Sequence, residues 1–191
     1  MNVNPATRDV LVGLIDESVA NVNLRRHMLA TEAVMRALAG RLGHDPDLWG
    51  LTGLAHDLDA EETAHDASRH GAQAAERLAG LDLPDDLVHA VAAHNPATGT
   101  LAERPIDVAL IAADQTTGLI TAAALVRPDH ALPEVKEKSV RKRLREGAFA
   151  RGVDRASIAR CEELGLDLDE FLGLALQAMQ GIAAELGLAG E

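Results

Sequence analysis

The sequence predicts an all-α, single-domain helical bundle, and three observations lead to that prediction. Alanine and leucine dominate the 191 residues, whereas the chain has one Trp, two Phe and no Tyr, a balance that favours helices over sheets. Apolar residues recur at helical spacing, and no alternation typical of strands competes with it. Proline and glycine fall between the periodic segments, where they mark helix starts and stops.

Helix starts are predicted at prolines, because proline suits the first helical position, where its missing N–H is not needed. Asn4-Pro5, Asp45-Pro46 and Leu83-Pro84 are such starts, and the corresponding stops are glycines at positions 43, 80 and 165. The clearest stripe of a packed amphipathic helix consists of Leu24, Met28, Thr31, Met35, Leu38 and Leu42. The nine expected helices cover residues 6–20, 24–42, 46–56, 67–79, 84–94, 105–126, 134–146, 155–164 and 168–187, with loops at 95–104 and 127–133.

Charge and composition restrict the classes of partner. The chain carries 18 basic and 30 acidic residues, and its formal charge of −12 repels a polyanionic backbone, so we expect no long nucleic acid. A small phosphorylated ligand is still compatible with this negative net charge, because a bound cation makes the electric field around its site positive. The single cysteine, Cys161, cannot form an intramolecular disulfide, which fits a cytoplasmic location. The apolar run from Leu119 to Val126 is too short to cross a bilayer, so we expect no membrane association.

Three histidines are followed by aspartate, but one of these dipeptides differs from the others. Asp45 and Asp66 are explained as caps of the helices that follow them. His56-Asp57 instead ends the apolar run 51–55, so its side chains emerge from a helix that should be buried. Burying such groups without partners costs several kcal/mol. A metal ion is one partner for both groups, and a hydrogen-bonded buried pair is the alternative.

Two further residues have ligand chemistry beside an apolar helix face. His27 lies on a row with Thr31, Val34 and Leu38, and Asp114 lies on the row of residues 110, 111 and 118. A lone histidine in such a position is usually a hydrogen-bonded core residue. A carboxylate in so apolar a helix needs a strong partner, which makes Asp114 the stronger candidate.

The order His27, then His56-Asp57, then Asp114 resembles the H…HD…D signature of the HD-domain superfamily of metal-dependent phosphohydrolases, over residues 24–126. The resemblance implies a helical bundle of the HD-domain type in which these four residues hold a divalent metal. His70 and His94 resemble the extra histidines of binuclear members, which include cyclic-dinucleotide phosphodiesterases and symmetric diadenosine tetraphosphate hydrolases. By that resemblance they would hold a second metal, with Asp57 bridging. The expected cofactor is one or two divalent transition metals, Fe, Mn, Zn, Ni or Co.

The function implied by the resemblance is hydrolysis of a phosphomonoester or phosphodiester of a small molecule, with a nucleotide as the first candidate, by a metal-activated water. Asp57 is the first catalytic candidate, because it would bridge and orient the metals. Asp59 is the second, as a proton donor or acceptor or as a holder of a metal-bound water, with a solvated carboxylate as the alternative. Related phosphodiesterases often carry a lysine shortly after the dipeptide, whereas residues 58–61 here are Leu-Asp-Ala-Glu, so the sequence identifies no general acid.

Basic residues gather in one C-terminal segment of this acidic chain: Lys136, Lys138, Arg141, Lys142, Arg143 and Arg145, after a loop that carries Arg127. A solvated helix face explains most of them. We expect Arg127 and Lys138 as candidate substrate-binding residues. Residues 125–149 also resemble a C-terminal extension of uncharacterised HD proteins. One domain, 1–191, is therefore expected, with a metal-binding core at 24–126 and a helical extension at 134–187.

Several alternatives stay open. A di-iron oxygenase could use the same ligand set. A non-catalytic nucleotide-binding or regulatory module would be expected to have lost some ligands, whereas all six candidate positions retain ligand chemistry. The remaining histidines, at positions 44, 65, 89 and 130, are expected at the surface. Leu172, Leu176 and Met179 can pack either on the core or on a second subunit, which leaves a homo-oligomer open.

Overall fold

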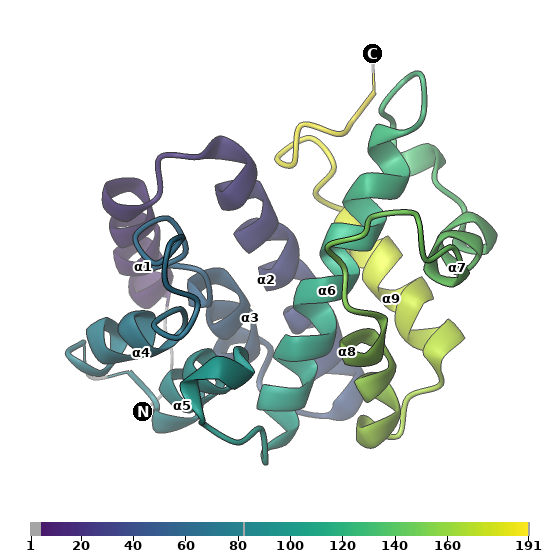
Figure 1. Cartoon of the computed structure of the whole chain (residues 1–191). Coiled ribbons are helices and arrows are strands. Elements are labelled where there is room, and N and C mark those ends of the chain that lie inside the picture. The colour runs from purple at the N-terminus through teal and green to yellow at the C-terminus, as the bar shows by residue number, and fades with distance from the viewer. Residues whose placement is uncertain (1–4, 82, 191) are drawn as a thin grey trace.

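The computed structural model describes residues 5–81 and 83–190, and every regular element in these ranges is a helix (Figure 1). The α-helices are α1 (Pro5–Ser18), α2 (Val22–Leu42), α3 (Pro46–Ala55), α4 (Ala72–Ala79), α5 (Asp85–Ala93), α6 (Pro105–Leu125), α7 (Glu137–Arg145), α8 (Arg155–Ala159) and α9 (Leu168–Gln180). Short 3-10 turns, η1 (Pro96–Thr98), η2 (Leu132–Glu134) and η3 (Arg160–Leu164), lie between them. The all-α prediction is confirmed; Asn4 of the first expected start lies outside the described residues.

Most expected helices agree with the structure to within three residues at each end, but two are five or more residues shorter at one end. The helix expected at 67–79 begins only at Ala72, because Gly71 takes a φ of +82° and the carboxylate of Asp59 caps the new start. Asp66 therefore caps no helix; it accepts hydrogen bonds from Ser68 in a turn. The last helix, expected to reach 187, ends at Gln180.

The segment expected as one helix at 155–164 is divided. It is α8 followed by the 3-10 turn η3, and it ends at Gly165, whose φ is +75°. The three glycines predicted as stops all follow their helices, and Gly43 and Gly165 adopt the left-handed conformation that ends a helix without strain.

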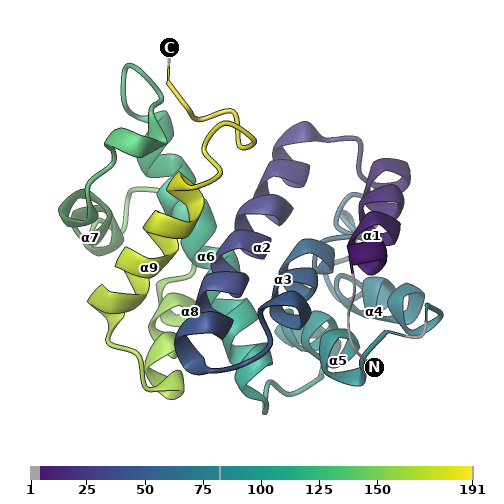
Figure 2. The ribbon, with the colours of Figure 1, turned by 180° about the vertical axis from the view of Figure 1, so that it is seen from behind.

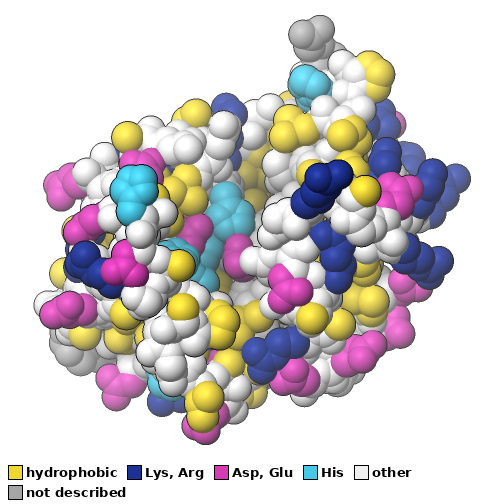
Figure 3. All heavy atoms as spheres, viewed as in Figure 1, with side chains coloured by type: hydrophobic (Ala, Val, Ile, Leu, Met, Phe, Trp, Pro, Cys, Tyr) yellow, Lys and Arg dark blue, Asp and Glu magenta, His cyan; other side chains and the backbone are white. Residues whose placement is uncertain are grey.

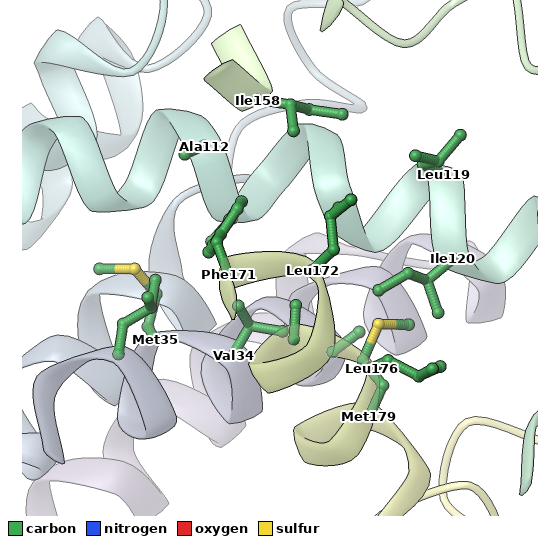
Figure 4. Packing of buried hydrophobic residues seen from close by; sticks show 14 of the residues in the cluster. Val34, Met35, Ala112, Leu119, Ile120, Ile158, Phe171, Leu172, Leu176 and Met179 are labelled. Carbon is green, nitrogen blue, oxygen red and sulfur yellow. The ribbon is translucent and has the colours of Figure 1, made fainter. Parts of the chain in front are cut away.

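The apolar side chains form two clusters that share α2. The larger one packs α2, α6, α8 and α9 together, with Val34 and Met35 of α2 against Phe171 and Leu172 of α9 (Figure 4). The smaller cluster joins α1, α3, α4 and α5, and Met28 is the fully buried contribution of α2 to it. The two halves lie on either side of α2 in both views of the ribbon (Figures 1 and 2). Helix α2 thus connects two cores.

Helices α2 and α3 approach each other backbone to backbone. A Cβ added to Gly53 would lie 2.7 Å from the carbonyl oxygen of Thr31, so only glycine fits this crossing. His27 lies one turn before Thr31, and His56 lies three residues after Gly53. The close crossing therefore brings the two histidines to the same place.

Helix α6 runs through the middle of the larger core. By length and composition it is the one helix of the described chain that could span a membrane, but 67% of its most apolar window is buried inside the protein, as in the core helix of a soluble protein. Leu172, Leu176 and Met179 are also buried here, with exposed fractions of 2% or less. These three leucine and methionine side chains therefore pack on the core of their own chain.

Candidate metal centre

The six predicted ligands come from five parts of the chain and meet in one furrow. His27 lies on α2, His56-Asp57 directly after α3, His94 directly after α5, and Asp114 on α6. His70, the sixth, lies in the turn that precedes α4. Figure 3 shows histidine and acidic side chains gathered in the central hollow of this face.

One group of ligand atoms lies between α2, α3 and α6. His27 Nε2 is 3.3 Å from His56 Nε2, 3.6 Å from Asp57 Oδ2 and 3.0 Å from Asp114 Oδ1. The ligand atoms of His27, His56 and Asp57 all lie within 4.8 Å of one another, close enough to hold one ion. Asp114 faces the same group from the other side of the furrow, with its Oδ1 3.8 Å from His56 Nε2.

A second group shares Asp57 with the first. Asp57 Oδ1 is 3.3 Å from His70 Nε2 and 3.7 Å from His94 Nε2, and these two nitrogens are 3.1 Å apart. Asp57, His70 and His94 again satisfy the distance expected of ligands to one ion. The two oxygens of Asp57 thus face two adjacent sets of histidines.

All four histidines direct Nε2 inward and bind Nδ1 on the outside. His56 and His94 face backbone carbonyls through Nδ1, Gly53 O at 2.8 Å and Val91 O at 2.6 Å. His70 Nδ1 is 2.9 Å from Asp59 Oδ1, and His27 Nδ1 is 3.1 Å from the Thr117 hydroxyl, which donates its own hydrogen to Asp114 O. When such an imidazole is neutral, an acceptor at Nδ1 fixes the tautomer that leaves a lone pair on Nε2, which is the form that binds a metal.

The carboxylates of the furrow are held in their charged form. Burial raises the pKa of Asp57, but the imidazoles of His56, His70 and His94 outweigh burial and bring it well below the usual range. Asp114 shows the same balance, with the histidines at 27 and 56 lowering its pKa. Hydrogen bonds to Asp57 and Asp59 raise the pKa of His70 to about 10, so a cation that binds its Nε2 displaces a proton.

The donor set fits a divalent transition metal. Neutral imidazole nitrogens and carboxylate oxygens are the ligands that Zn²⁺, Fe²⁺, Mn²⁺ and similar ions share, and their outer hydrogen bonds are in place. A family model, the HD domain, matches residues 24–126, more than half of the chain. The chain belongs to the HD-domain family. Proteins of this family are generally metal-dependent phosphohydrolases. Comparisons with curated proteins and with solved structures found no match.

Asp59, expected as a catalytic group or as a solvated carboxylate, does not lie in the furrow of this HD domain and is not exposed to solvent. It is fully buried behind His70, where its carboxylate accepts the backbone N–H groups of Gly71 and Ala74 as well as the contact from His70. Burial raises its pKa, but these hydrogen bonds outweigh burial and lower it. Asp59 therefore orients His70 and caps α4, and faces away from the furrow.

The structure does not bring the two expected substrate-binding residues to the centre of the HD domain. Arg127 lies in the turn after α6 and forms an ion pair with Asp129 at 2.8 Å. Lys138 lies on α7 with its side chain exposed, and α7 packs on the side of α6 and α9 (Figure 1). Neither belongs to the two ligand groups or lines the cavity that adjoins His27.

Three of the four histidines expected at the surface are exposed: His44, His65 and His130. His89 differs, because its side chain is only 25% exposed and its Nδ1 lies 3.1 Å from the buried carboxylate of Asp107. Asp107 itself accepts the backbone N–H groups of Glu103 and Arg104 at the start of α6. His89 is half-buried because it contacts Asp107 on another helix, and the helical spacing of the sequence does not predict that contact.

Three supporting residues were missed by the sequence analysis. Thr117 bonds His27, and its position three residues after Asp114 on the same helix face was an available signal. The side chain of Asn95 donates to the carbonyl of His70 at 2.9 Å. Gly71 leaves room for His94, since a Cβ there would lie 3.0 Å from the imidazole. Nothing in the sequence pattern around Asn95 and Gly71 pointed to these contacts.

Proposed function

We propose that this protein is a hydrolase of small phosphate esters and that the furrow is its active centre. One observation carries the proposal: four histidines aim Nε2 at two charged aspartates while each Nδ1 is bonded on the outside. Such an arrangement prepares nitrogen lone pairs for cations and has no comparable use in a simple hydrophobic core. The HD-domain match supports the same reading.

The protein residues have distinct tasks in this proposal. His27, His56 and Asp114 would hold one cation and His70 and His94 a second, while the two oxygens of Asp57 face both groups. When bound, divalent cations polarise phosphoryl oxygens and lower the pKa of water. Asp57, held ionised by the surrounding histidines, keeps a negative charge beside the reacting phosphate and can orient a nucleophilic water.

The test is metal content and esterase activity of the purified protein, after incubation with Mn, Fe, Co, Ni or Zn. We expect His56→Ala and Asp57→Ala to lose bound metal and hydrolysis of p-nitrophenyl phosphate and bis(p-nitrophenyl) phosphate. His65→Ala is the matched control, because His65 also precedes an aspartate but is exposed and belongs to neither ligand group. It should retain both properties.

Two results would argue against the hydrolase. If the wild-type protein stays metal-free with every ion, the furrow is not a metal-dependent catalytic centre, and a helical binding module is favoured. A metal-loaded protein that cleaves no monoester or diester but consumes oxygen only when it contains iron would favour the di-iron oxygenase, for which the same ligands are suitable.

A further inference from the structure

A cavity of about 460 Å³ adjoins the candidate metal centre on its α2 side. Its walls are the N-terminal half of α2, the C-terminal half of α6 and the segment 186–188. Figures 1 and 2 show this C-terminal segment, in yellow, between the upper ends of α2 and α6. His27 lines the cavity too, so the cavity opens directly onto the ligand groups. A molecule held at the metals would extend into it.

The wall formed by α6 and the C-terminal segment is mostly apolar. It consists of Gly118, Thr121, Ala122, Leu125, Leu186, Gly187 and Leu188. The α6 part spans two helical turns, roughly 10 Å along the helix axis. This length and the aliphatic side chains suit an extended apolar group.

No Phe or Trp side chain of the described chain lines this cavity. Trp49 and Phe171 are buried elsewhere, and Phe149 packs against Arg143. Proteins that bind nucleobases usually stack them on aromatic rings or guanidinium planes. The two planar groups in the cavity wall have other tasks in the proposed site, because the imidazole of His27 directs Nε2 to the ligand groups and the guanidinium of Arg26 is suited to phosphate oxygens. The remaining wall therefore suits an aliphatic group better than a base.

The opposite wall carries Arg26. Its guanidinium makes no hydrogen bond or ion pair with any of the residues 5–81 and 83–190, although the side chain is half-buried. Arg25, its neighbour, bonds Asp16 at 2.6 Å and the carbonyl of Val19. Gly187 leaves room for this guanidinium on the other side, because a Cβ there would lie 2.5 Å from a guanidinium nitrogen. An unpaired, half-buried guanidinium beside His27 is suited to phosphate oxygens.

We propose that this cavity binds the apolar organic group of the substrate and that Arg26 binds its phosphate oxygens. The proposal rests on the hydrolase function and narrows its substrate to phosphate esters of aliphatic groups rather than nucleotides. Each methylene removed from water raises affinity by a factor of about four. We therefore expect metal-loaded protein to cleave n-hexyl phosphate with a kcat/KM at least about tenfold above that for glycerol 2-phosphate or deoxyadenosine 5′-monophosphate.

Two substitutions separate the two parts of the cavity. Arg26→Gln should weaken binding of inorganic phosphate by about tenfold or more, the usual effect of losing a hydrogen bond to a charged group. Leu125→Ser should lower kcat/KM for n-hexyl phosphate by about fivefold and leave phosphate binding unchanged. Arg145→Gln and Leu101→Ser are matched controls, because both residues are exposed and neither lines the cavity. All four variants should retain the wild-type metal content.

The outcomes distinguish failure of the cavity proposal from failure of the hydrolase proposal. If esters are cleaved but Arg26→Gln and Leu125→Ser behave like their controls, or if the nucleotide is the better substrate, the cavity proposal is overturned and the hydrolase stands. If no ester is cleaved, calorimetric binding of phosphate and n-hexyl phosphate to metal-loaded protein decides: binding weakened by the two substitutions supports the cavity without the hydrolase. Absence of binding overturns both.

Discussion

The candidate histidine ligands are held from behind by chemically different acceptors. His56 and His94 use backbone carbonyls, His27 a hydroxyl and His70 the carboxylate of Asp59. A carboxylate is the strongest of these acceptors, because it is charged and makes the attached imidazole more basic. His70 therefore depends on one side chain for its orientation more than the other three do.

We predict that Asp59→Asn weakens the second metal position specifically. The amide oxygen can still accept from Gly71 and Ala74, but the amide nitrogen then donates to His70 Nδ1 and forces the proton onto Nε2. Cobalt titration followed by visible absorption should show the second equivalent bound about 10- to 100-fold more weakly. Asp66→Asn, an exposed aspartate nearby, should bind both equivalents as wild type does; equal titrations for the two variants would contradict the role of Asp59.

Helices α2 and α3 position two of the ligands through one close contact. Gly53 sits against the backbone of Thr31 and Glu32, and its own carbonyl accepts from His56. Backbone atoms cannot move away as a flexible side chain can, so the crossing tolerates no larger residue. The separation of His27 from His56 is thus set by packing that lies outside the furrow.

We predict that two alanine substitutions of helical glycines change the free energy of unfolding in opposite directions. Gly53→Ala should lower the free energy of unfolding by about 1–3 kcal/mol, the usual cost of overpacking. Gly40→Ala should raise it by about 0.5–1 kcal/mol, since a Cβ at that exposed position meets no atom within 4 Å and alanine favours the helix. Urea denaturation measures both. Two substitutions with the same effect would mean that the α2–α3 crossing can relax.

The whole molecule consists of two apolar cores with the candidate ligands along the seam. Asp114 comes from α6 in the larger core and His27 from α2, which both cores share, while His56, His70 and His94 belong to elements of the smaller core. A bound cation would therefore connect the two halves of the molecule. Its binding energy would add to the stability of the folded chain.

We predict that metal removal lowers the melting temperature of the wild-type protein. A ligand at 100 times its Kd contributes about 2.7 kcal/mol, which for a chain of this size shifts Tm by roughly 5 to 10 °C. Calorimetry with and without a chelator measures the shift. In His56→Ala the chelator should change Tm little, and a shift as large as in wild type would place the metal elsewhere.

The sequence was sufficient for the helical class and for naming six candidate ligands that the structure brings together, but the supporting contacts needed the structure. Helical periodicity and the order of His27, His56-Asp57 and Asp114 are local patterns, so they could be read along the chain. Asp59 was assigned to chemistry because a carboxylate two residues after Asp57 gives no sign of which way it faces. Its contacts with Gly71 and Ala74 join segments more than ten residues apart, which no periodicity encodes.

The shared position of Asp57 has a consequence for how cations would enter the furrow. One carboxylate cannot neutralise two divalent ions fully, so the first ion to arrive reduces the attraction left for the next. Loading would be sequential, with a gap between the two affinities. The fraction of doubly loaded molecules would then follow the free metal concentration of the surroundings, and activity that needs both ions would rise and fall with metal supply.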